Sequence, residues 1–185
     1  MKITSRTNID FRKRNLVFID LEFTGLDPNV HEILEIGCVL VDPDLQVIKT
    51  FETKTIPEHS ETADPASLVM NGYSEEKWKN AVPLKNALEE LNQLAKDAMF
   101  AGWNISSDWL FLDKGFQRFE INPIFDYHFI DAMSIAYVKF LHTDKPESLR
   151  LRNMAEYYGI EMGETHGALE DATATYKIFK KLMEK

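Results

Sequence analysis

The sequence has a single cysteine and no long apolar run. Because Cys38 is the only cysteine among 185 residues, an intramolecular disulfide is excluded, and its apolar neighbours favour a buried thiol. No apolar stretch approaches the roughly 20 residues that a membrane span requires. The polar amino terminus also lacks the apolar segment of a secretory signal. We therefore expect a cytoplasmic protein in a reducing compartment, without a membrane partner.

The sequence also lacks an excess of positive charge. It has 21 lysine and arginine residues against 30 aspartate and glutamate residues, a net charge of −9 at pH 7. A module that binds nucleic acid by phosphate neutralisation alone is normally basic, so the acidity argues against that class. It is compatible with an enzyme whose carboxylates hold divalent cations, because the cations then provide the positive charge that meets phosphates.

The chain is long enough for one compact domain and has no internal repeat or linker-like stretch. Residues 1–15 are predicted to form a short arm and residues 16–185 a single domain. Apolar and β-branched runs predict strands over 16–23, 32–41 and 47–55, which short turns would join into an antiparallel meander.

Helices and strands alternate after this meander. The periodicity predicts strands at 99–103 and 127–130, and helices at 83–96, at 106–119, from the fifth strand to about 141, at 147–158 and at 168–183. Ser106 or Ser107 is predicted to cap the second of these helices. The order indicates an α/β architecture in which helices pack on a mixed sheet.

Asp20 and Glu22 are two residues apart on the first predicted strand, so both side chains lie on the same face. Two carboxylates on an otherwise apolar strand are unfavourable without a compensating charge. A bound cation would compensate them. Exposure at the end of the strand, beside Thr24 and Gly25, would do so as well, and for an isolated pair it is the commoner explanation.

Two further pairs of residues bear on this choice. Asn104 and Asp108 follow a short apolar strand where a helix begins, and His166 lies five residues before Asp171, in a loop that leads into the last helix. Asp108 alone is explained by the helix dipole, and a histidine before a helix is usually a surface or capping residue. A carboxylate in the first turn of the last helix can, however, point back toward the sheet.

Three segments resemble, in order and spacing, the three motifs of the DEDDh (DnaQ-like) 3′→5′ exonucleases: residues 20–26, the pair Asn104 and Asp108, and the pair His166 and Asp171. That family includes the proofreading subunit of bacterial DNA polymerase III, ribonuclease T and oligoribonuclease. The resemblance extends over residues 16–182. It implies the ribonuclease H-like fold, an α/β fold with a mixed central sheet and flanking helices. The first three strands of this sheet are antiparallel.

The resemblance also implies a set of catalytic residues and cofactors. The metal-site acids would be Asp20, Glu22, Asp108 and Asp171, with Asp20 shared between two ions, and His166 would be the general base. Mg²⁺ or Mn²⁺ suits a site built only from oxygen ligands. The implied reaction is hydrolysis of a phosphodiester at a 3′ end, which releases nucleoside 5′-monophosphates by a two-metal mechanism.

The resemblance implies single-stranded DNA or RNA 3′ ends as partners, and dimers are common among its members, so a homodimer is a further expectation. The residues expected to bind the terminal nucleotide are Phe23, Thr24, Gly25, Leu26 and Asn104. Asp131 matches a position that supports the site without binding metal. Ser107 and Trp103 depart from the family, which often has an aromatic and a histidine there, and neither departure replaces a metal ligand.

Three alternatives remain open at this point. The first is an oligoribonuclease-like enzyme restricted to short RNA. The second is a catalytically weak module that only binds nucleic acid, which would be expected to have lost a ligand or the base, whereas all five residues are present. The third is a phosphoesterase that acts on a small nucleotide, which spaced acids alone would permit.

Overall fold

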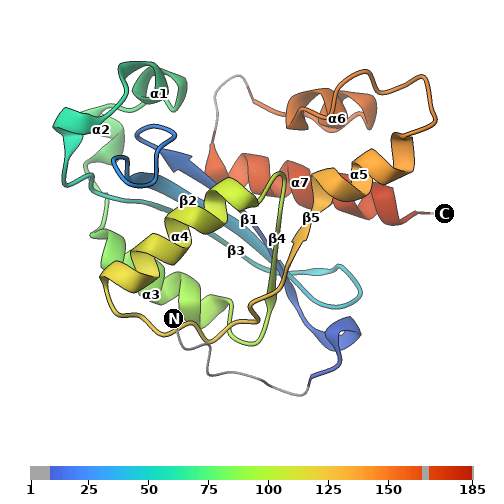
Figure 1. Ribbon diagram of the computed structural model, residues 1–185, viewed down its shortest axis with the longest axis horizontal. Helices are drawn as coiled ribbons and strands as arrows, with labels where there is room; N and C mark the ends of the chain where they lie inside the picture. The colour runs from blue at the N-terminus through green and yellow to red at the C-terminus, as the bar shows by residue number, and fades with distance from the viewer. Residues whose placement is uncertain (1–8, 164–166, 185) are drawn as a thin grey trace.

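The computed structural model describes residues 9–163 and 167–184. Its centre is a five-stranded mixed sheet with the strand order β3-β2-β1-β4-β5 (Figure 1). The first three strands are antiparallel, as predicted, and β4 and β5 complete the mixed sheet by pairing in parallel on the other side of β1. The strands are β1 (Leu16–Phe23), β2 (Ile33–Val41), β3 (Val47–Lys54), β4 (Met99–Gly102) and β5 (Phe129–Asp131).

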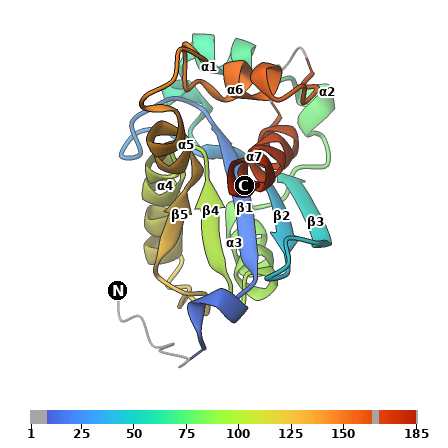
Figure 2. The same cartoon turned by 90° about the vertical axis from the view of Figure 1, so that its right-hand side faces the viewer.

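Helices cover both faces of the sheet. One face carries α3 and α4, while α7 crosses β1 and β2 on the other face, next to α5 and α6 (Figure 2). Over the described part of the chain, none of the helices combines the length and apolarity needed to span a membrane. The helices are η1 (Phe11–Lys13), η2 (Ser60–Thr62), α1 (Pro65–Met70), α2 (Glu75–Trp78), α3 (Leu84–Leu94), α4 (Ser106–Arg118), α5 (Ala132–Phe140), α6 (Leu151–Tyr157) and α7 (Ala168–Met183).

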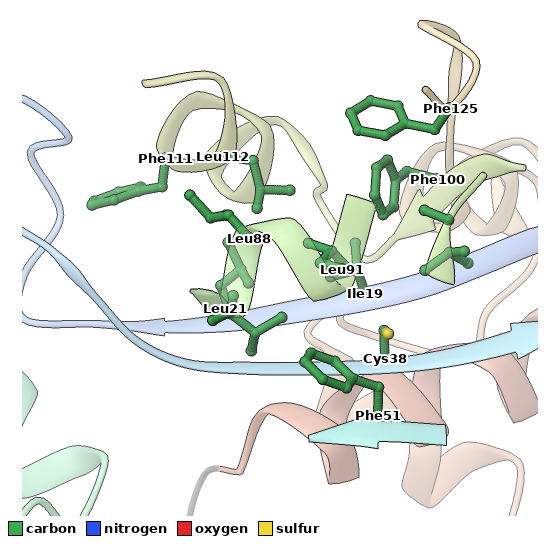
Figure 3. Packing of buried hydrophobic residues seen from close by; sticks show 14 of the residues in the cluster. Ile19, Leu21, Cys38, Phe51, Leu88, Leu91, Phe100, Phe111, Leu112 and Phe125 are labelled. Atoms are coloured by element: carbon green, nitrogen blue, oxygen red, sulfur yellow. The ribbon is translucent and has the colours of Figure 1, made fainter. Parts of the chain in front are cut away.

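The alternation of β1 divides its side chains between two cores. Val17, Ile19 and Leu21 pack with α3 and α4 in the larger core, which Figure 3 shows from close by. Leu16 and Phe18 point to the opposite face and pack beneath α7. Because the side-chain period of a strand is two residues, the next positions on the α7 face are 20 and 22. The two acids of β1 therefore extend the α7 side of the sheet.

Cys38 lies in the larger core (Figure 3), as its apolar neighbours predicted. The thiol is fully buried, and burial raises its pKa to about 12. A thiol that stays protonated at neutral pH is a poor nucleophile and a poor metal ligand, so Cys38 serves packing.

The predicted serine cap of α4 is wrong. Ile105 occupies the N-cap position with a helical backbone, and no side chain caps the helix. The chain turns earlier, at Asn104, whose φ is +57°. Both Ser106 and Ser107 are therefore already inside the helix, and the Ser106 hydroxyl donates to Asn104 Oδ1 at 3.4 Å.

Two predicted boundaries were also wrong. The last strand begins at Phe129 rather than at residue 127, because the Asp126 carboxylate accepts the His128 N–H at 3.0 Å and holds that segment in a turn. The helix predicted from residue 147 begins at Leu151. The Ser148 hydroxyl accepts the Arg150 N–H at 3.2 Å, and Arg150 itself has an extended backbone.

Candidate active site

Three acids from distant parts of the sequence form a cluster at the carboxyl end of β1. Asp20 and Glu22 come from β1, and Asp171 comes from the first turn of α7; one carboxylate oxygen of each lies within 4.8 Å of the other two. The approach of α7 depends on Gly37 of β2, because a Cβ there would collide with the backbone of residues 168 and 169. The amino terminus of α7 therefore rests directly on the sheet, and Asp171 reaches β1.

Asp108, the fourth predicted acid, approaches from the other side of β1. It lies in the first turn of α4, is 5% exposed, and accepts the Leu21 N–H at 3.0 Å. That N–H is available because β1 pairs with β4 only as far as Phe18. Leu21 lies between Asp20 and Glu22, so Asp108 binds the backbone of β1 between these two acids. It is not one of the three acids whose carboxylate oxygens converge.

The acids of the cluster raise one another's pKa values. Burial raises the pKa of Asp20 well above its usual range, and the charges of Asp108, Asp171, Glu22 and Glu35 add to this effect. Burial and the charge of Asp171 raise the pKa of Glu22 to about 8. Burial also raises the pKa of Asp108 to about 7, against the hydrogen bonds that it accepts. Such a group fits a divalent cation, which neutralises the repulsion and prefers oxygen ligands.

A fifth acid, Glu35, was missed in the sequence. It lies on β2 directly opposite Glu22 and is 4% exposed. A signal for it was present, because Glu35 is the only charged residue of the apolar strand Ile33–Val41. An acid within an apolar strand is the same feature that drew attention to Asp20.

The loop after β1 begins with Thr24, which is fully buried. Its N–H donates to Glu32 O at 2.8 Å, its hydroxyl accepts the Glu32 N–H at 2.9 Å, and its carbonyl accepts the Asp64 N–H at 2.7 Å. The polar groups of Thr24 are thus used to shape the loop. Gly25 has no room for a side chain, because the ring of His31 covers it, whereas Leu26 is 86% exposed.

The other two predicted substrate contacts are Phe23, the last residue of β1, and Asn104, which follows β4. Phe23 stacks on Phe111 of α4, with ring centroids 3.9 Å apart, so one face of its ring is occupied. Asn104 is exposed, and its N–H donates to Asp131 Oδ1 at 2.9 Å. The same carboxylate oxygen caps α5 by accepting the Met133 N–H at 3.2 Å. Asp131 therefore links Asn104, just after β4, to the start of α5.

His166, the predicted general base, lies outside the described residues. Its role as general base is therefore a prediction from the resemblance of His166 and Asp171 to the third motif of the family.

The raised pKa values predict how the stability of the metal-free protein depends on pH. Above about pH 5 the unfolded chain has released the protons of Glu22 and Asp108, whereas the folded protein keeps them until the pH passes the pKa of about 7 for Asp108 and about 8 for Glu22. The free energy of unfolding should therefore be highest near pH 5 and fall as the pH rises through 7 and 8. For a chain of this size, each kcal/mol lost from the free energy of unfolding lowers Tm by ~2–4 °C. In EDTA we therefore expect Tm to drop by at least ~5 °C between pH 5 and pH 9.

Thermal unfolding in EDTA at pH 5, 7 and 9 measures this drop, and Mn²⁺ should reduce it. Glu22→Gln should make the drop smaller, because glutamine does not titrate and the contribution of Asp108 remains, whereas Glu89→Gln on the exposed side of α3 should leave the drop unchanged. A Tm that is constant or rises across this range would contradict the explanation.

The fold and the acidic cluster together define a class: a ribonuclease H-like α/β domain with an acidic site at the end of its central strand. Exonuclease I has this fold, with a TM-score of 0.78 and 19% identity over 92% of this chain and 42% of that one. The structure of E. coli exonuclease I with a dT13 oligonucleotide gives a TM-score of 0.79 at 17% identity, over 92% of this chain and 41% of that one.

The exonuclease family RNase_T matches residues 17–179, so the chain belongs to this family and those residues form an exonuclease domain. The chain is 31% identical to the 3′-5′ exonuclease DinG of Staphylococcus epidermidis, over 90% of its own length and 18% of DinG. It is 26% identical to the PolC-type DNA polymerase III of Staphylococcus haemolyticus, over 96% of its own length and 12% of that protein. The chain thus spans less than a fifth of the curated relatives that it matches.

Proposed function

We propose that the protein is a metal-dependent 3′→5′ exonuclease. It hydrolyses the last phosphodiester of single-stranded DNA or RNA and releases nucleoside 5′-monophosphates in the cytoplasm. The observation that carries this proposal is the cluster of Asp20, Glu22 and Asp171, with carboxylate oxygens within 4.8 Å of one another at the end of β1. The family membership supports it, as does the similarity to DinG, which is named as a 3′-5′ exonuclease.

The four predicted acids would hold two Mg²⁺ or Mn²⁺ ions. Asp20, central in the group, would contact both, Glu22 and Asp171 would share one, and Asp108 would help to hold the other. Bound divalent ions supply positive charge that favours ionised water and offsets the charge of the phosphate. A structure of E. coli exonuclease I with single-stranded DNA is described as a zinc-ion-bound form, which supports a divalent ion as the cofactor of this fold.

The residues of the chain supply the proton transfer and the orientation of the strand. His166 would accept a proton from the attacking water while the oxygen bonds to phosphorus, and the 3′ oxygen of the preceding nucleotide would leave. Leu26, with its side chain 86% exposed, would contact the terminal base together with the backbone of Gly25. Phe23 would offer its free ring face, Asn104 would contact the strand from the α4 side, and Thr24 would act through the shape of the loop.

Oligonucleotides labelled at the 3′ or the 5′ end, as DNA and as RNA, test this proposal directly. With Mg²⁺ or Mn²⁺ the 3′ label should be released as a mononucleotide, while the 5′-labelled strand shortens stepwise, and EDTA should stop both processes. Strands of 2 to 20 nucleotides show whether the enzyme is restricted to short RNA. No hydrolysis of any strand with either ion, or release that begins at the 5′ end, would contradict the proposal.

A further inference from the structure

Glu35 lies beside the acidic cluster but uses its carboxylate differently. It occupies β2 between Glu22 of β1 and Lys54 of β3 in the antiparallel register. Its Oε2 is paired with Lys54 Nζ, and its Oε1 accepts the Ala168 N–H at 3.1 Å. Both oxygens therefore have partners in the protein, and Glu35 is not among the acids whose ligand atoms converge.

The contact to Ala168 fixes the start of α7. The N-cap residue, Gly167, has no side chain to accept the first N–H groups of this helix, and no side chain caps it locally. Glu35 provides the missing acceptor from a neighbouring strand, and its charge is favourable at the positive end of a helix. Gly37 lies two residues further along the same face of β2 and leaves room for the helix backbone.

The position of α7 decides where Asp171 lies. Asp171 is in the first turn of the helix, and its N–H donates to Gly167 O at 2.9 Å, so its carboxylate moves with this turn. We propose that Glu35 is a positioning residue: by holding the amino end of α7 against β2, it keeps the Asp171 carboxylate at ligand distance from Asp20 and Glu22. Lys54 in turn fixes the Glu35 side chain.

Two substitutions separate positioning from metal binding. Glu35→Gln keeps a carbonyl oxygen that can accept the Ala168 N–H but removes the negative charge, whereas Glu35→Ala removes the acceptor. We expect the glutamine variant to stay within about threefold of wild type in Mn²⁺ affinity and kcat. The alanine variant should lose about 10- to 100-fold in both, the usual effect of removing a group that orients a ligand, with an unchanged KM for the oligonucleotide.

Calorimetry with Mn²⁺ and hydrolysis of a labelled oligonucleotide measure these effects on the full chain. Glu52→Ala, on the exposed side of β3, is the matched control and should behave like wild type. If Glu35→Ala does not fold, Glu35→Met, which fills the space without offering an acceptor, replaces it with the same expected losses.

Two outcomes would overturn the proposal. If glutamine is as damaging as alanine, the charge of Glu35 is required, and its hydrogen bond to the Ala168 N–H does not explain its role. If alanine and methionine bind Mn²⁺ as wild type does, Glu35 does not position Asp171. The kcat measurement rests on the proposed function, but the calorimetry does not. A wild-type protein that binds Mn²⁺ without hydrolysing any strand would sink the proposed function and still leave the role of Glu35 measurable.

Discussion

Replacing Asp20 by asparagine should reduce oligonucleotide hydrolysis by roughly 10³-fold or more. Asp20 is the residue whose pKa is raised by all the other acids of the site, Asp108, Asp171, Glu22 and Glu35, which makes it the centre of the cluster. Asparagine has almost the same shape but no charge, so the variant should lose most of its divalent-ion affinity. Charge stabilisation of about 4 kcal/mol by a bound ion corresponds to this factor.

The same substitution should have the opposite effect on stability. In EDTA at pH 8, Asp20→Asn should raise Tm above the wild-type value, because it removes a like charge from a buried group. Calorimetry with Mn²⁺, thermal unfolding and the labelled-strand assay give the three readouts. Asp44→Asn, in the exposed turn between β2 and β3, should leave all three unchanged. Wild-type Mn²⁺ affinity in Asp20→Asn would exclude Asp20 as a ligand.

The parts of the site that follow from local periodicity could be predicted from the sequence. A strand at 16–23 with a two-residue period places Asp20 and Glu22 on one face, and the apolar spacing of residues 168–183 gives α7 with the observed bounds. Both patterns depend only on neighbours in the chain. The acid in the first turn of α7 could therefore be expected at the sheet before the structure was known.

Contacts between distant segments could not be predicted in the same way. Asp108 meets the Leu21 N–H because β1 extends beyond its pairing with β4, and strand pairing lengths are set by tertiary structure. Glu35 contacts Ala168 across 133 positions of the sequence. The apolar strand around Glu35 indicated an unusual acid, but its role depends on the position of α7. Gly37 allows the backbone of α7 to lie against β2 because it has no side chain.

Replacing His166 by alanine should separate catalysis from metal binding. If His166 is the general base, its loss should reduce kcat by about 10²- to 10⁴-fold. The acids that hold the ions are unchanged, so Mn²⁺ affinity and Tm should stay at wild-type values, in contrast to Asp20→Asn. His142→Ala, at an exposed position after α5, is the matched control.

The pH profile of the His166→Ala variant distinguishes the loss of a general base from a loss of packing. Without a base, the reaction depends on hydroxide from solvent, so the residual rate should keep rising from pH 7 to pH 9, where the wild-type rate levels off. Added imidazole should restore part of the rate, because it can accept the proton that His166 no longer takes. A wild-type rate in His166→Ala, or an equal loss of rate and of Mn²⁺ affinity, would remove His166 from the proton transfer. In the first case water loses its proton without a side-chain base, and in the second His166 belongs with the residues that hold the ions.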